Sequence, residues 1–206
     1  MRKNKISNKG KAFIFILVCI ISACSYVYIK LTTPPTLESI LSNTTFNTSE
    51  VTLDVTISNK NTEVNYTYVI SEKNDYIKTI KKYDNKEEVS VVYKVDSKYY
   101  LYVNKGNPII IELTDADGLA MLDELKTEVN ELELYLDVDY NSVKYYTYSE
   151  ELITFSSYND YVFYDYELVI VESQLVSLLQ TFTVNNVVNT VEINVIDMQD
   201  IIIPTI

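Results

Sequence analysis

The chain has 206 residues, and its 17 Lys and Arg against 29 Asp and Glu give a formal net charge of −12 at pH 7. A protein this acidic repels phosphates, so we expect no nucleic-acid partner. The sequence has no histidine, which excludes a Ser-His-Asp triad and imidazole metal sites. Its two cysteines, Cys19 and Cys24, precede the body of the chain, which excludes thiolate zinc sites, thiol catalysis and disulfides there. We therefore expect no cofactor, no metal and no enzymatic activity.

Residues 1–23 have the pattern of a secretory signal peptide, with a basic start and a short apolar run. The apolar run begins at Ala12, and the small residues Ser22 and Ala23 stand directly before Cys24. An aliphatic residue and two small residues ahead of a cysteine resemble the bacterial lipobox, in which the cysteine carries the lipid. The resemblance implies cleavage before Cys24, lipidation of Cys24 and attachment of the protein to a membrane.

An uncleaved membrane anchor is the alternative, because the 18 residues from Ala12 to Ile29 carry no charge and are long enough to span a bilayer. The basic N-terminus stays in the cytoplasm in either case, so residues 30–206 lie outside the cytoplasmic membrane. The small residues before Cys24 favour the lipoprotein, anchored at the outer face of this membrane. Cleavage leaves 12 Lys and Arg against 29 acidic residues, a net charge of −17, so attachment to an anionic surface must come from the anchor.

The processed chain begins with a tether and a short helix. Residues 24–36 contain a Thr-Thr-Pro-Pro stretch, which favours a stiff, extended spacer. Thr36 is a suitable N-cap for a helix from Leu37 to Leu41 that ends at Ser42-Asn43.

Strand patterns follow. Val51, Leu53, Val55 and Ile57 alternate with polar residues, which is the period of a half-buried strand. Turn-forming residues separate further runs of this kind, so we predict strands at 51–57, 64–70, 75–83, 88–95, 98–104 and 108–113.

A helix interrupts the strands, with Asp115 as its predicted N-cap and apolar residues at helical spacing from Leu119 to Val129. The Asp115–Gly118 stretch lacks the further oxygen ligands of a calcium loop, so capping explains its acids better. Alternating leucines predict that strands resume directly after the helix, with Glu131, Glu133, Asp137 and Asp139 on a solvent face. The predicted strands of this second half are 132–138, 143–148, 152–156, 161–171, 175–184 and 187–195.

About a dozen strands and two helices predict a mainly β (α+β) fold with one domain. The order of elements resembles the LolA-like family of bacterial envelope proteins, which includes the LprG and LppX types of lipoprotein. The matching stretches are Leu37 to Ile57, Tyr166 to Val184 and Val187 to Pro204. The resemblance covers residues 37–206 and implies a single curved antiparallel sheet, or incomplete barrel, with two short helices on one face.

In that family the space between sheet and helices takes acyl chains or hydrophobic peptides. The resemblance therefore implies a non-enzymatic lipoprotein that binds a lipid or another hydrophobic ligand in this space. The expected lining residues come from the apolar faces: Leu53, Val55, Tyr66, Tyr68, Leu119 and Leu122. The alternative is an interaction or sensory lipoprotein that binds an envelope protein and no small molecule. The tyrosine clusters at 98–102, 145–148 and 158–166 suit a binding surface, but they also suit ordinary half-buried strands.

Overall fold

The computed structural model describes residues 35–205 except 150, 160, 161 and 199, together with the isolated positions 22 and 25. Cys24, the predicted cleavage site before it and most of the predicted tether lie outside the described residues. Leu37–Ile206 forms one compact unit. No helix among the described residues is long and apolar enough to cross a membrane.

The described elements are mostly strands. In chain order they are α2 (Leu37–Ser42), β1 (Glu50–Asn59), β2 (Glu63–Ser71), η1 (Glu72–Asn74), β3 (Tyr76–Tyr83), β4 (Lys86–Val95), β5 (Lys98–Asn104), β6 (Pro108–Leu113), α3 (Asp115–Asn130), η2 (Glu131–Leu136), η3 (Tyr140–Ser142), β7 (Val143–Ser149), β8 (Leu152–Asn159), β9 (Val162–Val171), β10 (Gln174–Val184) and β11 (Val187–Ile196).

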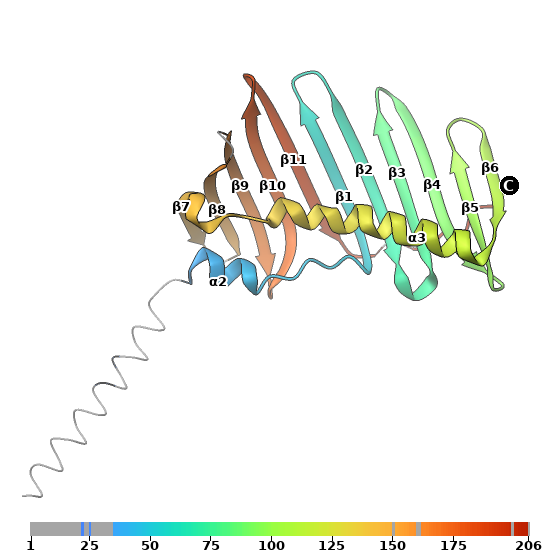
Figure 1. The fold of residues 1–206 in the computed structure, drawn as a ribbon, viewed down its shortest axis with the longest axis horizontal. Coiled ribbons are helices and arrows are strands. Elements are labelled where there is room, and N and C mark those ends of the chain that lie inside the picture. Colours follow the sequence, from blue (N-terminus) through green and yellow to red (C-terminus); the bar gives the residue numbers. More distant parts are fainter. Residues whose placement is uncertain are drawn as a thin grey trace, which may run out of the picture. The chain divides into compact units, whose positions relative to one another are not determined.

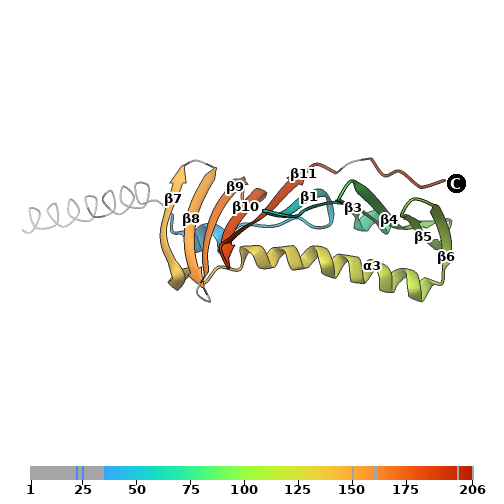
Figure 2. The ribbon, with the colours of Figure 1, turned by 90° about the horizontal axis from the view of Figure 1, so that it is seen from above.

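These strands form one open antiparallel sheet in the order β6-β5-β4-β3-β2-β1-β11-β10-β9-β8-β7 (Figures 1 and 2). The chain runs outward from β1 to the edge strand β6, crosses along α3, and returns from the other edge, β7, inward to β11. The first and last strands therefore meet at the centre of the sheet, where Leu53 pairs with Val195 and Ile57 with Val191. The predicted mainly β fold with a single antiparallel sheet is confirmed, and the sheet is not closed.

Four of the hairpins turn through two residues that both have positive φ, the pattern of type I′ turns, which match the twist of antiparallel strands. The turns are Asp84-Asn85, Asp96-Ser97, Glu172-Ser173 and Asn185-Asn186. Asn and Asp tolerate this left-handed conformation better than most residues. The register of each hairpin follows from its turn, which keeps the apolar residues of neighbouring strands on one face.

The main hydrophobic core lies on the face of the sheet that packs against α3, called the α3 face below. Alternation along the strands directs Leu53, Tyr68, Leu168 and other apolar side chains to this face. Leu122 and Val129 of α3 complete the cluster, together with Leu37 of α2. Because sheet and core lie wholly within Leu37–Ile206, this unit carries the core that a domain needs to fold independently.

The opposite face carries a smaller apolar cluster. Val69, Tyr76, Val91 and Tyr93 are buried there, and Ile201 of the C-terminal segment packs against them. The Tyr76 hydroxyl donates a hydrogen bond to the Ile202 carbonyl oxygen at 3.4 Å. The segment after β11 thus covers part of the sheet face that α3 leaves open.

The N-cap of α3 lies one residue earlier than expected. The N-cap is Thr114 and not Asp115, because the Thr114 hydroxyl accepts a hydrogen bond from the Asp117 backbone N–H at 3.2 Å. One turn on, Gly118 lies directly against the ring of Tyr99 in β5. The absence of a side chain at Gly118 allows the start of α3 to approach the sheet closely.

The predicted strand at 132–138 is wrong, because residues Glu131–Leu136 form the 3-10 helix η2. No turn-forming residue separates this segment from α3, so the chain leaves the α-helix in a tighter helical turn. The leucines alternate in the sequence, but their burial does not follow a strand: Leu132 is buried, whereas Leu134 is 68% exposed. Glu131, Glu133, Asp137 and Asp139 therefore lie on helical turns and their connections, and not on the solvent face of a strand.

Candidate functional site

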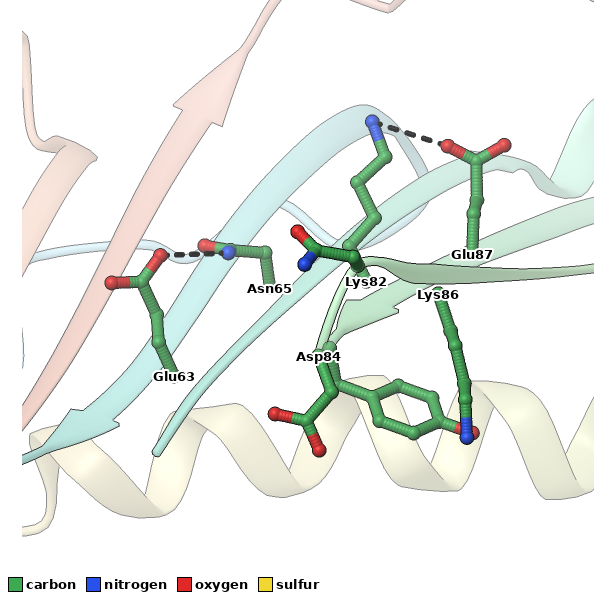
Figure 3. Close-up of a pocket in the computed structure, with 8 residues that line it drawn as sticks. Glu63, Asn65, Lys82, Asp84, Lys86 and Glu87 are labelled. Carbon is green, nitrogen blue, oxygen red and sulfur yellow. Dashed lines mark hydrogen bonds and ion pairs between the residues drawn. The ribbon is translucent and has the colours of Figure 1, made fainter. Parts of the chain in front are cut away.

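The largest surface depression that we describe, of about 630 Å³, lies at the β3–β4 hairpin (Figure 3). Most of its lining side chains are charged or amide groups, and four of them form two pairs. Lys82 lies 3.3 Å from the Glu87 carboxylate, and the Asn65 amide donates to Glu63 at 3.0 Å. Lys82 and Glu87 are both more than half exposed. These charged groups are exposed to solvent, so the depression is a polar surface turn and a weak candidate for a ligand site.

Three other cavities form a row between the α3 face of the sheet and the segment from α3 to η3. The first, the Lys81 cavity, measures about 420 Å³ and lies between strands β2–β5 and α3. The second, the Tyr68 cavity, measures about 450 Å³ and lies between β1–β2 and the junction of α3 with η2. The third, the Tyr166 cavity, measures about 310 Å³ and lies between β8–β10 and the η2–η3 segment. Each volume falls within the range of about 300–1,000 Å³ that is typical of small-molecule sites.

The three cavities are neighbours that share walls. Tyr66 and Glu128 line both the Lys81 cavity and the Tyr68 cavity. Leu134 and Tyr135 line both the Tyr68 cavity and the Tyr166 cavity. Together the cavities form a groove across the sheet, called the sheet–helix groove below.

The geometry of α3 explains why the groove opens on one side of the helix. Successive residues of an α-helix are about 100° apart, so Met121 and Glu128, seven residues apart, share one flank. Both line the Lys81 cavity. Lys126 and Asn130 are each two residues from Glu128, about 200° around the helix, and so lie on the opposite flank. Leu122 and Val129 point at the core.

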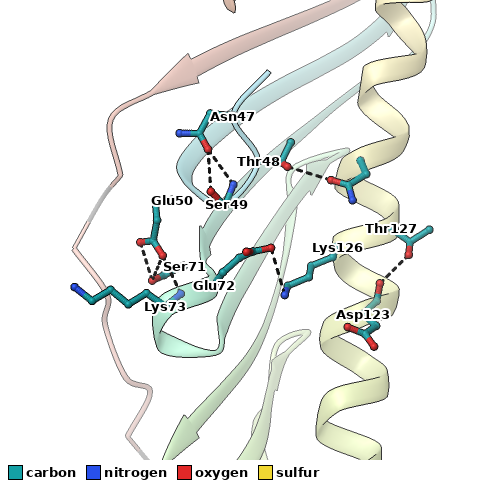
Figure 4. Close-up of polar contacts among 11 residues, drawn as sticks. Asn47, Thr48, Ser49, Glu50, Ser71, Glu72, Lys73, Asp123, Lys126 and Thr127 are labelled. Carbon is teal, nitrogen blue, oxygen red and sulfur yellow. Dashed lines mark hydrogen bonds and ion pairs between the residues drawn. The ribbon is translucent and has the colours of Figure 1, made fainter. Parts of the chain in front are cut away.

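The opposite flank of α3 is tied to the sheet by polar contacts (Figure 4). The Lys126 ammonium lies 3.3 Å from the Glu72 carboxylate, and the Thr48 hydroxyl bonds to the Asn130 side-chain oxygen at 3.1 Å. Glu50 holds the same end of the sheet, because it accepts hydrogen bonds from the Ser71 hydroxyl and the Lys73 backbone N–H. These contacts hold one flank of the helix, and the groove runs along the other.

Tyr68 lies on the floor of the second cavity and makes a partly buried hydrogen bond there. Its hydroxyl donates to the Glu128 carboxylate at 2.8 Å, and its ring stacks on Tyr66 with centroids 6.0 Å apart. Burial, and then the negative charge of Glu128, raise the pKa of Tyr68 above its ordinary value of 10.0. Tyr68 therefore stays neutral and keeps donating its proton across the physiological range.

A network of charged and phenolic groups surrounds the mouth of the Lys81 cavity. The Tyr83 hydroxyl donates to Glu88 at 2.6 Å, and the Lys105 ammonium lies 3.0 Å from the same carboxylate. These two partners, Tyr83 first, lower the pKa of Glu88 below its ordinary value. Lys81 lies over the rings of Tyr66 and Tyr83, at 5.4 and 5.3 Å from their centroids.

The third cavity has an aromatic wall with polar groups. Tyr166 stacks on Phe155 at 4.4 Å between centroids and accepts a hydrogen bond from the buried Gln180 amide at 2.9 Å. Burial raises the pKa of Tyr166. Asp137 and Asp139 also line this cavity and are exposed, which makes this end of the groove acidic.

Three of the six expected lining residues lie at the groove: Val55, Tyr66 and Tyr68 line the Tyr68 cavity. Leu53 and Leu122 are buried in the core and line none of the three cavities. Leu119 also lines none of them and is 49% exposed. It is two residues from Met121, about 200° around the helix, and so belongs to the flank away from the groove.

Sequence reasoning missed Lys81, Met121 and Glu128 as lining residues. The acidic residues of α3, Glu128 among them, are exposed, so Glu128 did not stand out from the others as a lining residue. The seven-residue spacing of Met121 and Glu128 was the available signal, because it marks a common flank. It becomes informative only when the contact side of the helix is known. Lys81 gave no signal, since a charged residue in an alternating strand normally faces water.

No group of three or more carboxylates in the described part of the chain is arranged to hold a metal ion. Comparison with protein-family models and with curated proteins finds no match for this chain.

Proposed function

We propose that the chain is a non-enzymatic, lipid-anchored envelope protein that holds a hydrophobic ligand in the sheet–helix groove. The observation that carries this proposal is the row of three adjoining cavities between the sheet and the segment from α3 to η3. Concave, largely apolar and aromatic sites with a few polar groups are typical of small-molecule binding. Val55, Tyr68 and Leu132 supply apolar surface in the central cavity, and Tyr66 and Tyr135 supply aromatic walls.

We further infer that both helices cover the same face of a curved sheet, as expected from the resemblance to LolA-like proteins. Leu37 of α2 and Leu122 of α3 belong to one core cluster, which supports this placement. In such an arrangement α3 and η2 form one wall of the groove and the sheet forms its floor.

Binding rather than catalysis is proposed because the two carboxylates of the Lys81 cavity are engaged in structural contacts. Glu128 accepts from Tyr68, and Glu88 is held by Tyr83 and Lys105. A general base needs a carboxylate within reach of a substrate proton and free to accept it. The proposed role for the membrane rests on Cys24, which would carry the lipid anchor and keep the domain at the outer face of the cytoplasmic membrane.

The test is the lipid content of the Leu37–Ile206 unit, purified from bacterial cells without detergent. We expect native mass spectrometry to show adducts that organic extraction identifies as lipid. We also expect N-phenyl-1-naphthylamine, a neutral apolar dye, to bind the extracted protein with saturable fluorescence. A folded protein with no adduct and no saturable dye binding would refute the proposal.

A second candidate function is binding of another envelope protein, which the β7–β9 end of the sheet favours. Tyr145 and Phe163 are 62% and 60% exposed there, and Tyr158 packs against Phe163 at 4.6 Å. Exposed aromatic side chains are enriched at protein interfaces. Crosslinking of the full chain in the envelope would recover a partner bound at these residues, and replacing Tyr145 and Phe163 by serine would abolish its capture.

A further inference from the structure

Lys81 is the feature of the groove that the binding of an apolar ligand alone does not explain. It projects from β3 into the first cavity and is half-buried. In the described part of the chain no carboxylate lies within ion-pair distance of its ammonium. The other lysine that lines this cavity, Lys105, is paired with Glu88 at 3.0 Å. The rings of Tyr66 and Tyr83 stabilise the Lys81 cation only in part, since a cation–π contact leaves its three N–H donors free.

A second polar group at the same place lacks a partner. Among the described side chains, Thr79 Oγ1 is the buried polar atom for which no hydrogen bond is found. Thr79 is two residues before Lys81 on β3, so both lie on the α3 face, and both line the same cavity. A buried hydroxyl without a hydrogen-bond partner is destabilising, so its presence indicates that a partner is missing.

The charge of the groove changes from one end to the other. Residues 72–112, which include β3 to β6, contain eight lysines and seven acidic residues. Residues 115–200 contain two lysines and 18 acidic residues, and they supply Glu131, Asp137 and Asp139 to the second and third cavities. The Lys81 cavity carries Lys81 and Lys105 against Glu88 and Glu128, so its charges balance and an anionic group is repelled less there than at the acidic end.

We propose that the Lys81 cavity binds the anionic head group, a carboxylate or a phosphate, of an amphiphile whose apolar tail lies in the Tyr68 cavity. Lys81 pairs with the head group, and Thr79 hydrogen-bonds to it directly after a χ1 rotation or through a water molecule. Tyr66, which lines both cavities, lies where head and tail meet. This inference rests on the proposed function and deepens it, because it names the class of ligand and its direction in the groove.

The experiment compares ligands of one chain length that differ only in the head group. Hexadecanoic acid, hexadecyl phosphate and hexadecanol displace N-phenyl-1-naphthylamine from the Leu37–Ile206 unit at pH 8 and low ionic strength. We expect the two anions to bind about tenfold more tightly than the alcohol, because a charge-assisted contact in a half-buried site is strong. This preference should fall as salt is added.

Lys81→Met keeps the length and apolar body of the side chain but removes the charge. We expect it to reduce the preference for the anions to within about twofold while leaving the affinity for the alcohol unchanged. Lys82→Met is the matched control, because it makes the same change of net charge at the next residue, on the opposite face of β3. Thr79→Val should weaken the binding of the anions by a smaller factor and leave alcohol binding intact.

The outcomes separate this inference from the proposed function. If the unsubstituted protein binds acid, phosphate and alcohol equally, the head-group site is refuted and the hydrophobic groove stands. If Lys82→Met lowers the preference as much as Lys81→Met, the effect is one of net charge and the site is likewise refuted. If none of the three ligands displaces the dye, both proposals fail. A preference for one anion over the other identifies the head group as carboxylate or phosphate.

Discussion

Gly118 and Tyr99 are in such close contact that a Cβ atom on Gly118 would overlap the Tyr99 ring, with its Cδ2 only 2.8 Å away. Tyr99 is buried, and its hydroxyl donates to Asp75 at 3.2 Å, which limits how far the ring moves aside. This contact fixes the distance between the start of α3 and β5. The groove that opens further along the helix depends on that distance.

We predict that Gly118→Ala destabilises the protein by about 1–3 kcal/mol, the usual cost of overpacking a well-filled contact. The measurement is urea unfolding of the Leu37–Ile206 unit, followed by circular dichroism. If nothing obstructed the new methyl group, the substitution would instead raise stability by about 1 kcal/mol, because alanine favours a helix interior over glycine. A gain in stability would show that α3 does not need close approach at Gly118.

Two exposed leucines, Leu134 at the groove and Leu119 away from it, allow the position of the ligand to be tested. Leu134 lines the Tyr68 and Tyr166 cavities, whereas Leu119 lies on the flank of α3 away from them. We predict that Leu134→Gln weakens the binding of N-phenyl-1-naphthylamine about threefold or more, because apolar contact with the ligand is lost. Leu119→Gln is the matched control and should bind the dye like the unsubstituted protein. Equal effects of the two substitutions would place the dye elsewhere.

The hydroxyl of Tyr68 makes the stability of the folded protein fall at alkaline pH. Its pKa is raised in the folded protein, whereas in the unfolded chain it ionises near the ordinary value of 10.0. Below pH 10 both states keep the proton, so the full stabilisation is present. Above pH 10 the unfolded state releases the proton first, and stability falls as pH rises.

We predict that Tyr68→Phe is less stable than the unsubstituted protein at pH 7, by about 1 kcal/mol for the lost hydrogen bond to Glu128. The difference should shrink as the pH rises above 10, because phenylalanine has no proton to lose. Urea unfolding at pH 7 and pH 10.5 measures both values. Tyr145→Phe, at an exposed position, should match the unsubstituted protein at both pH values, and unfolding curves for Tyr68→Phe that stay equally separated would contradict the argument.

Substitution of the two cysteines tests whether Cys24 carries a lipid anchor. We predict that Cys24→Ala abolishes labelling of the full chain by radioactive palmitate, because the modified sulfur is removed. Cys19→Ala should retain the label, since Cys19 lies within the segment that cleavage removes. The Cys24→Ala protein should either be released or stay tethered by uncut signal, and fractionation distinguishes the two. Labelling that persists in Cys24→Ala would refute the lipobox assignment.

The sheet was largely predictable because apolar and polar residues alternate along its strands and turn-forming residues separate them. The predicted strands 88–95 and 98–104 leave Asp96-Ser97 between them, and both of these residues have the positive φ of a turn. What failed was the segment after α3, where leucines at every second position suggested a strand. A period of two is a reliable sign only when the segment has a neighbour to pair with, and the sequence alone does not show one.

The groove was less predictable than the fold. Val55 and Tyr68 were expected at it because they lie on the apolar face of their strands, and any layer placed on that face would touch them. Lys81 and Glu128 were not expected, because their positions depend on which flank of α3 turns toward the open part of the sheet. That choice follows from contacts between residues far apart in sequence, such as Lys126 with Glu72 and Gly118 with Tyr99.

The pairing of β1 with β11 sets the order in which the protein can assemble. Thr52 lies opposite Ile196, so the middle of the sheet forms only after almost the whole chain is present. Until then, the first six strands and the last five are separate halves, and each exposes an unpaired inner strand to aggregation. Such long-range pairing slows folding relative to a fold built from local contacts. A ribosome-bound or truncated chain that ends before β11 therefore stays unfolded at its centre, and the final ten-residue strand acts as the step that commits the domain to its native structure.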